Sequence, residues 1–282
     1  MPHFTKTQLK EKAEELGLYL DKKRGQCVLT ENEIAHFAVE SLAPEKSESV
    51  LEIGPGFGIL TEILVKRARH VHAIEFDKKM IEFLKDTYND QNLTLIHGDC
   101  IKTDWPPVSK IISNLPYHIS GPFFSRLCFS NCTTGVFMVQ KEFAERLMAD
   151  VNTKEYNRVS ILTQICFQIQ IIKAVPRQAF YPQPEVDSVL IKIESQASKP
   201  EPASLHELEA LLQGVFPYKG KVLQNGLKYY AKREAQFQPV YQELIANPQN
   251  VPLRQRIRHI TPQEFLQLAK DIQNVKKQIQ EN

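Results

Sequence analysis

A glycine-rich turn, Gly54-Pro55-Gly56-Phe57-Gly58, has residue types that suit ligand binding, and it directly follows the apolar stretch 49–53. Glycine lets the backbone approach a ligand where a side chain would block it. The helix expected after the turn would add unpaired backbone N–H groups. A dinucleotide-binding turn has the same pattern, and so does a plain tight connection between a strand and a helix. The turn alone therefore leaves the ligand open.

Two carboxylates are expected beside this turn. Glu75 ends the next predicted strand, about 20 residues after the first glycine, where an acid usually receives ribose hydroxyls. Asp99 ends the strand after that. Taken singly, Glu75 could be a solvated acid and Asp99 a helix cap or turn acid. Because the ends of parallel strands meet at one sheet edge, the three features together favour an adenosyl ligand.

The tetrapeptide Asn114-Leu115-Pro116-Tyr117 suits methylation of an adenine amine, which is a poor nucleophile because its lone pair is delocalised. The Asn114 side-chain oxygen and the Leu115 carbonyl could accept the amine hydrogens. Pro116 stiffens the loop, and Tyr117 offers a face on which a base can stack. A sulfonium methyl is already activated, so catalysis is mainly alignment, and S-adenosylmethionine is favoured over a dinucleotide. The alternative is an ordinary proline turn.

The elements that must position these residues alternate between strand and helix patterns, which predicts a doubly wound, Rossmann-like α/β sheet with helices on both faces. The expected strands are 49–53, 71–74, 93–97, 110–113, 136–139 and 186–193. The expected helices in the same part are 5–20, 31–42, 59–69, 78–88, 121–129, 141–149 and 157–168.

A second domain is expected after the polar, proline-bearing stretch 195–204, which is typical of a linker. No strand pattern recurs beyond it. Helix patterns cover 205–216, 220–232, 237–246 and 262–280. The sequence therefore predicts an α/β domain over 1–195 and a small all-helical domain over 196–282.

The charge balance limits the function classes. The chain has 282 residues with 35 Lys and Arg against 33 Asp and Glu, a net charge of +2. This balance excludes a uniformly basic nucleic-acid coat and a highly charged disordered chain. It also hides a difference, because residues 196–282 hold 12 basic and 8 acidic residues whereas residues 1–195 hold 23 and 25.

No apolar run reaches the roughly 18 residues that a membrane span needs, and residues 1–24 lack the apolar core of a secretory signal. The five cysteines form no Cys-x-x-Cys pair, and their odd number speaks against a disulfide framework or a zinc site. Reduced, mostly buried thiols are expected. We therefore predict a cytoplasmic protein with no membrane partner and no metal site.

The motifs resemble those of the KsgA-type family of small-subunit ribosomal RNA adenine dimethyltransferases, most of all its archaeal branch. The resemblance covers nearly the whole chain. The matching segments are Gly25-Gln26, Glu52–Gly56, Asn114–Ser120, Gln140–Ala144, Thr153–Tyr156, Ala179–Ser188, and Phe216 with Lys221–Leu227.

The resemblance implies a monomeric enzyme that uses S-adenosylmethionine as its cofactor. Its partner would be the small ribosomal subunit, whose rRNA carries two adjacent adenosines in a hairpin loop near the 3′ end. Each adenosine would receive two methyl groups on its exocyclic amine, during biogenesis of the subunit. Residues 1–195 would then be the methyltransferase domain, and residues 196–282 would dock on RNA and ribosome.

The resemblance also implies roles for individual residues. The catalytic set would be Asn114, Leu115, Pro116, Tyr117 and Phe180, with Phe180 covering the other face of the base; the alternative for Phe180 is a core phenylalanine. The cofactor contacts would be Gln26, Cys27, Leu29, Gly54, Gly56, Glu75, Asp99 and Asn114.

One departure concerns Gly25-Gln26-Cys27-Val28-Leu29, where the family has Asn or His followed by Phe at positions 27 and 28. A thiol is a much weaker hydrogen-bond partner than Asn or His. The contact at Cys27 would then use the backbone or be lost. We expect weaker cofactor binding than in relatives with Asn there, and a Cys27→Asn variant with an unchanged dissociation constant would refute this.

Two basic clusters are candidates for phosphate contacts, because each lies next to a family motif. They are Lys22-Lys23-Arg24 and the pair Lys219 and Lys221. For any one cluster, a solvated helix face is the alternative. An rRNA hairpin loop offers bases that are easily unstacked and flipped.

Two other functions compete with this interpretation. One is a large-subunit rRNA methylase of the antibiotic-resistance type, against which the helical tail and its Arg258–Pro262 segment speak. The other is an RNA-binding assembly factor whose methylation is vestigial. The Cys27-Val28 departure keeps that reading open, and the intact Asn114–Tyr117 motif argues against it.

Overall fold

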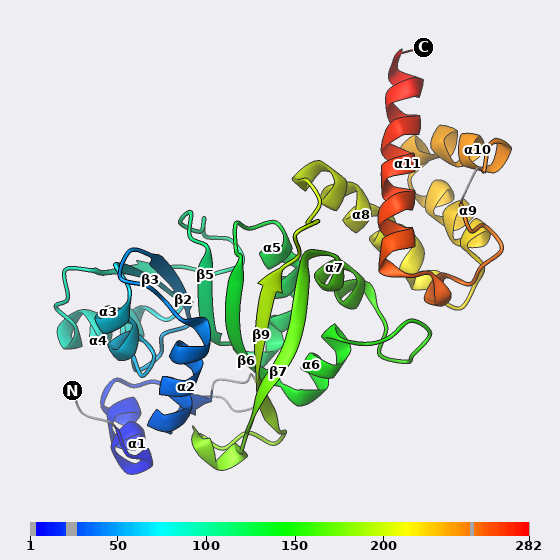
Figure 1. Ribbon diagram of the computed structural model, residues 1–282. Coiled ribbons are helices and arrows are strands. Elements are labelled where there is room, and N and C mark those ends of the chain that lie inside the picture. Colours follow the sequence, from blue (N-terminus) through cyan, green and yellow to red (C-terminus); the bar gives the residue numbers. More distant parts are fainter. Residues whose placement is uncertain (1–3, 21–26, 249–250, 282) are drawn as a thin grey trace. The chain divides into compact units, whose positions relative to one another are not determined.

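The computed structural model describes residues 4–20, 27–248 and 251–281 (Figure 1). The chain forms two compact units, which we call unit 1 (Met1–Ala144 with Gln168–Ser195) and unit 2 (Glu145–Phe167 with Gln196–Asn282). One of these boundaries coincides with the predicted break after residue 195. The segment 145–167, however, lies with the C-terminal helices, whereas the sequence placed it in the first domain.

Unit 1 is built on a seven-stranded sheet of order β4-β3-β2-β5-β6-β9-β7. Five strands are parallel, as predicted: β2 (Ser49–Ile53), β3 (His70–Glu75), β4 (Leu93–His97), β5 (Lys110–Asn114) and β6 (Thr134–Gln140). β9 (Ser188–Ser195) is antiparallel to β6, so the sheet is mixed at this side. β7 (Phe167–Val175) follows β9 in the sheet order, and the sequence analysis did not predict it.

Helices cover both faces of this sheet, as two consecutive residues of β6 show. Met138 belongs to a buried cluster with side chains of α2 (Asn32–Leu42) and α3 (Thr61–Arg67). Phe137 instead packs against Phe123 and Phe124 of α5 (Ser120–Cys128), with ring centroids 5.3 Å apart in each pair. Successive strand residues point to opposite faces, so one strand supports both layers.

The remaining elements of unit 1 are short. α1 (Lys6–Glu15) and α4 (Lys78–Thr87) share a second apolar cluster with Phe57, and the Asp77 side chain caps α4 by accepting from the amides of Lys79 and Met80. α6 (Lys141–Leu147) begins directly after β6, and its residues 145–147 belong to unit 2. β1 (Val28–Leu29) and β8 (Phe180–Tyr181) form a separate antiparallel pair.

Unit 2 contains α7 (Arg158–Cys166), α8 (Pro202–Val215), α9 (Leu223–Arg233), α10 (Gln238–Ala246) and α11 (Pro262–Glu281). Tyr156 is fully buried here, and its hydroxyl donates to the Ile260 carbonyl at 2.8 Å. The Asn152 amide donates to the Arg258 carbonyl at 2.9 Å. These contacts, and the packing of α7 against α8 and α11, explain why 145–167 joins this unit.

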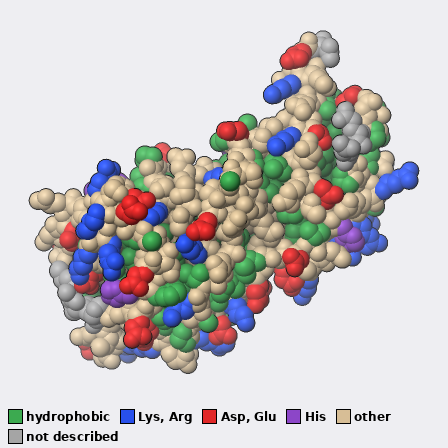
Figure 2. All heavy atoms as spheres, in the orientation of Figure 1, with side chains coloured by type: hydrophobic (Ala, Val, Ile, Leu, Met, Phe, Trp, Pro, Cys, Tyr) green, Lys and Arg blue, Asp and Glu red, His purple; other side chains and the backbone are tan. Residues whose placement is uncertain are grey.

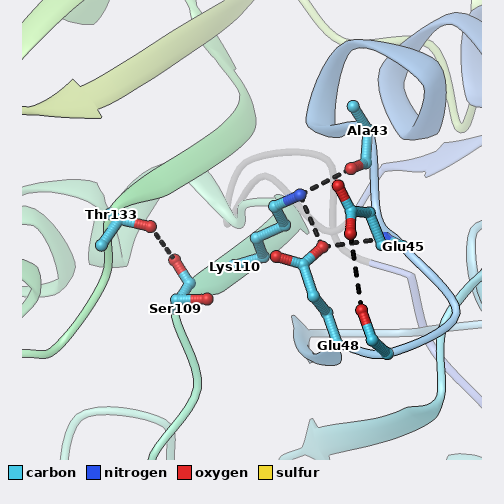
Figure 3. Close-up of polar contacts among 7 residues, drawn as sticks. Ala43, Glu45, Glu48, Ser109, Lys110 and Thr133 are labelled. Carbon is cyan, nitrogen blue, oxygen red and sulfur yellow. Dashed lines mark hydrogen bonds and ion pairs between the residues drawn. The ribbon is translucent and has the colours of Figure 1, made fainter.

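The amino edge of the sheet, where the parallel strands begin, is closed by paired charges (Figure 3). The Lys110 ammonium donates to the Ala43 carbonyl and to the Glu48 carboxylate, each at 2.6 Å. The Glu45 amide donates to the same carboxylate at 2.8 Å. Burial alone would raise the pKa of Glu48, but the hydrogen bonds from Lys110 and the Glu45 amide outweigh it and lower the pKa.

Two further expectations concern the whole chain. All five cysteines are free thiols and buried, as predicted. Within residues 4–20, 27–248 and 251–281, no helix combines the length and apolar character that crossing a bilayer requires.

Candidate active site

The glycine turn follows β2 and leaves open space in front of its backbone. Gly54 and Gly56 have φ angles of 66° and 54°, a region that residues with a Cβ rarely adopt. A Cβ built on either would meet no atom within 4 Å. At Gly58 a Cβ would lie 2.5 Å from the Tyr88 hydroxyl oxygen. The first two glycines thus keep a cradle open, while the third permits close packing.

Glu75 lies against this turn, because β3 pairs with β2 in parallel register. Its carboxylate accepts from the Gly56 amide at 3.3 Å and from the Asp77 amide at 2.9 Å. Only 9 % of the residue is exposed, so it is not a solvated acid. Burial raises the pKa of Glu75, and the backbone hydrogen bonds oppose that rise. The carboxylate can therefore accept hydroxyl hydrogens at the mouth of the turn.

Asp99 follows β4 and fills the role of a turn acid. One carboxylate oxygen accepts from the Ile101 amide at 2.8 Å, and the Asp99 carbonyl accepts from Lys102 and Thr103. The preceding residue is tied to the site, since the Gly98 amide donates to the Glu75 carbonyl at 2.8 Å. Asp99 thus stands beside Glu75, and the carboxylate oxygen that is not in the turn bond is the atom a ligand could use.

Asn114 ends β5, the neighbour of β2 on the side away from β3. Its side-chain amide donates to the Cys27 carbonyl at 2.9 Å, across 87 positions of sequence. The Ser113 hydroxyl donates to the Ile53 carbonyl at 2.7 Å, next to Gly54. Since the Nδ2 of Asn114 is engaged by a carbonyl, the orientation of its Oδ1 is fixed, and that oxygen can accept from a substrate amine.

The loop after Asn114 is anchored at both ends. The Leu115 amide donates to the Met138 carbonyl at 3.2 Å. Pro116 leads into a 3₁₀ turn, Tyr117–Ile119, that runs into α5. The Tyr117 hydroxyl is 2.7 Å from the Ser188 hydroxyl, and burial raises the pKa of Tyr117, so it stays protonated at neutral pH. These contacts fix the ring that would support a base.

Phe180 lies in the core, which favours the core-phenylalanine alternative over a ring that covers a base. It pairs with Leu29 in the β1–β8 ladder, and each residue is only 1 % exposed. Both belong to the buried cluster that includes Val39 of α2. The pairing of β8 with β1 directs the ring into this cluster, so the structure agrees with the core-phenylalanine alternative.

Cys27 contributes through its backbone, since its carbonyl holds Asn114 while the residue is 7 % exposed. Gln26 and the cluster Lys22-Lys23-Arg24 lie outside the described residues. Lys219 and Lys221 are exposed and belong to unit 2.

Phe76 is a site residue that the sequence analysis missed, and Glu52 is a buried acid of the strand that leads into the glycine turn. Phe76, between Glu75 and Asp77, is 72 % exposed and offers a ring face to a planar ligand. A large apolar residue directly after an acid at a strand end was the available signal. Glu52 is fully buried in β2, where the Thr61 hydroxyl donates to it at 2.7 Å. Burial raises the pKa of Glu52 to about 8, so it is mostly protonated at neutral pH.

The residues present fit S-adenosylmethionine. Glu75 can accept ribose hydroxyls, Phe76 can stack on adenine, and Gly54 and Gly56 leave room for backbone contact. A cavity of about 30 Å³ is lined by Phe57 of the turn with Asn32 and Glu62 among others, and not by Gly54, Gly56 or Glu75. The Asn32 Oδ1 atom is buried and accepts no hydrogen bond from the described residues.

Comparisons with known proteins place the sequence among rRNA methyltransferases. The sequence model of a family described as “Ribosomal RNA adenine dimethylase” matches residues 19–274. “Probable ribosomal RNA small subunit methyltransferase A” of Pyrococcus furiosus is 36% identical over 247 residues, covering 87% of this chain and 89% of that protein. The protein of the same name from Methanopyrus kandleri is 31% identical over 261 residues, covering 92% and 94%.

Solved structures give the same result for the fold. A dimethyladenosine transferase from Plasmodium falciparum matches with a TM-score of 0.74 and 28% identity, covering 88% of this chain and 98% of that one. The 23S rRNA methyltransferase ErmE matches with a TM-score of 0.60 at 23% identity, covering 87% and 99%, and this likeness shows a shared fold alone. From the family match and the relatives above 30% identity, the chain belongs to the ribosomal RNA adenine dimethylase family.

Proposed function

We propose that this chain transfers methyl groups from S-adenosylmethionine to the exocyclic amine of adenosines in small-subunit rRNA. The observation that carries the proposal is the placement of Asn114. Its side chain is locked by the Cys27 carbonyl at the end of β5, and β5 is fastened to the strand that ends in the glycine cradle. An amine acceptor and a cofactor cradle therefore stand on adjacent strand ends.

The chain's own residues have a limited task, because bound S-adenosylmethionine supplies an electrophilic methyl on a sulfonium. In the first transfer, Asn114 Oδ1 and the Leu115 carbonyl accept the two amine hydrogens, which takes the nitrogen lone pair out of conjugation with the ring. The amine loses one of these hydrogens as a proton when the N–C bond forms. Tyr117, held at its hydroxyl by Ser188, supports the base. Glu75 and the open glycines hold the cofactor. Rate enhancement then comes mainly from alignment.

The finer description of the substrate rests on the family. The two adjacent adenosines near the 3′ end of small-subunit rRNA would each receive two methyl groups, as a step in subunit biogenesis. Lys22, Lys23, Arg24, Lys219 and Lys221 would contact phosphates. The enzyme would work as a cytoplasmic monomer, with unit 1 forming the methyltransferase domain and unit 2 docking on the ribosomal particle.

The test is transfer of labelled methyl groups to purified small subunits that lack the modification, compared with naked rRNA and with large subunits. We expect incorporation on small subunits. Incorporation on large subunits alone would contradict the proposal and favour the other class of rRNA methylase. Tight binding to small subunits without any transfer would instead support an assembly factor.

A further inference from the structure

The exposed face of α9 and of the turn before it carries basic and aromatic side chains without any acid. Between residues 210 and 233 the chain contains five Lys or Arg residues and no Asp or Glu. We call this face the α9 surface. Its exposed members are Lys219, Lys221, Asn225, Lys228, Tyr229 and Lys232.

Helix geometry places these side chains in one stripe. Asn225, Lys228, Tyr229 and Lys232 are three or four positions apart, so they lie on the same side of α9. The opposite side is buried in unit 2, where Leu223, Leu227 and Tyr230 pack among others. The side chains of the stripe itself are exposed.

Tyr229 differs from the tyrosine that follows it. Tyr230 is 9 % exposed and stacks on Phe237, as a core residue does. Tyr229 is 41 % exposed and stacks on Tyr218, with ring centroids 4.6 Å apart and an interplanar angle of 28°. Tyr218 supports one face of the Tyr229 ring, and the exposed area leaves the ring accessible from outside. A supported, exposed aromatic ring is a platform on which another flat ring can stack.

The charges around this platform are not neutralised. Lys221, Lys228 and Lys232 make no ion pair within the described part of the chain, whereas Lys276 in the same unit pairs with Glu207 at 2.7 Å. Gly220 adds room, because a Cβ there would meet no atom within 4 Å. By contrast with the α9 surface, the face of unit 1 that Figure 2 shows has acidic and basic side chains interspersed. A positive, acid-free surface attracts a polyanion.

We propose that Tyr229, supported by Tyr218, stacks on an unpaired base of RNA while Lys228 and Lys221 contact the flanking phosphates. The combination of a stacking ring with exposed lysines on the same surface matches single-stranded nucleic acid, whose bases are free to stack and whose phosphates are negative. A double helix would engage the lysines but give the ring no base to stack on. This inference rests on the proposed function, because it names how the RNA partner is held.

The experiment measures binding of the full chain to a fluorescein-labelled single-stranded RNA of about eight nucleotides at several salt concentrations. Tyr229→Ala should weaken binding roughly tenfold without changing its salt dependence, since stacking releases no counterions. Tyr229→Phe should bind like the original chain, because it keeps the ring. Lys228→Gln should make the negative slope of log K against log salt less steep by about 0.7, the value for one phosphate contact on a single strand.

The matched control is Ile279→Ala, which trims an apolar side chain of α11 that is 41 % exposed, as Tyr229 is. Thermal unfolding of each variant checks that the fold is intact. Equal RNA binding by Tyr229→Ala and the original chain would overturn the inference, as would equal weakening by Ile279→Ala. The proposed function is tested separately by methyl transfer to small subunits. If the original chain methylates them and Tyr229→Ala binds RNA normally, only this inference fails.

Discussion

The two edges of the parallel sheet in unit 1 use polar residues in opposite ways. At the amino edge, Lys110 and Glu48 form an ion pair, and each also makes a hydrogen bond with a backbone group, the Ala43 carbonyl and the Glu45 amide respectively. At the carboxyl edge, Glu75 is buried with backbone amides as its partners, and it makes no ion pair among the described residues. Open space lies in front of Gly54 and Gly56. The polar groups of the amino edge bind one another and stabilise the fold, whereas those of the carboxyl edge can bind a ligand.

The comparison teaches how to separate structural from functional acids. A buried carboxylate without a cation reduces stability, so its retention at a strand end beside an open turn points to a role in binding. Variants at the carboxyl edge should therefore change activity or cofactor affinity more than stability. Variants at the amino edge should do the reverse.

The largest effect is expected from Asn114→Ala. Loss of the amine acceptor should lower the rate of methyl transfer by about 100- to 1,000-fold, similar to removal of one positioned hydrogen-bonding group in other active sites. RNA binding should change little. Single-turnover transfer to small subunits measures the rate, and Asn131→Ala, an exposed asparagine outside the site, is the matched control. Equal rates for the two variants would refute the role of Asn114.

The next effect concerns stability, at Glu52. Its folded pKa of about 8 lies above the ordinary value of 4.5, so its stabilising contribution is complete below pH 4.5 and is lost as pH rises through 8. The free energy of unfolding should fall by about 2 kcal/mol between pH 6 and pH 8 from this group. Urea titrations at both pH values should show a smaller fall for Glu52→Gln. The same fall in both proteins would mean that Glu52 is ionised when folded.

A smaller effect is expected from Gly56→Ala. The left-handed φ of 54° strains a residue with a Cβ, and the added methyl group enters the open cradle. The dissociation constant for S-adenosylmethionine should rise about tenfold by calorimetry. Gly220→Ala, which also adds a methyl group in open space but in unit 2, should leave that constant unchanged. If both variants bind equally well, the turn does not hold the cofactor.

The smallest effect belongs to the amino edge. Lys110→Met should lower the free energy of unfolding by about 1 kcal/mol and leave cofactor affinity unchanged. The pKa of Glu48 is lowered in the folded chain, so its contribution is present above pH 4.5 and is lost as pH falls below that value. Acid unfolding should thus be less steep in Lys110→Met. Weaker cofactor binding in this variant would contradict the division between the edges.

Local sequence patterns were enough to predict much of the fold. The strands β2 to β6 and the glycine turn are short-range features, since the apolar runs end at Gly or at polar residues. β7 was missed because no such residue separates it from α7: the helix ends at Cys166 and the strand begins at Phe167. The apolar pattern continues across this change from helix to strand, so the sequence does not mark where the strand begins.

The remaining features depend on contacts between distant segments. The bond from Asn114 to Cys27 spans 87 positions, and the bond that places Tyr156 in unit 2 spans 104. The burial of Phe180 follows from its pairing with Leu29, which the local sequence does not reveal. Residue types therefore indicated a cofactor and an adenine amine, but the partners that fix Asn114 and bury Phe180 needed the folded chain.

The most direct test of the central claim is the identity of the methylated nucleoside. Small subunits that lack the modification are incubated with the protein and S-adenosylmethionine, and their rRNA is digested to nucleosides for mass spectrometry. We predict adenosine carrying two methyl groups on its exocyclic amine, absent when Asn114→Ala replaces the original chain. Methylation of another base or of ribose, with no dimethylated adenosine, would contradict the account.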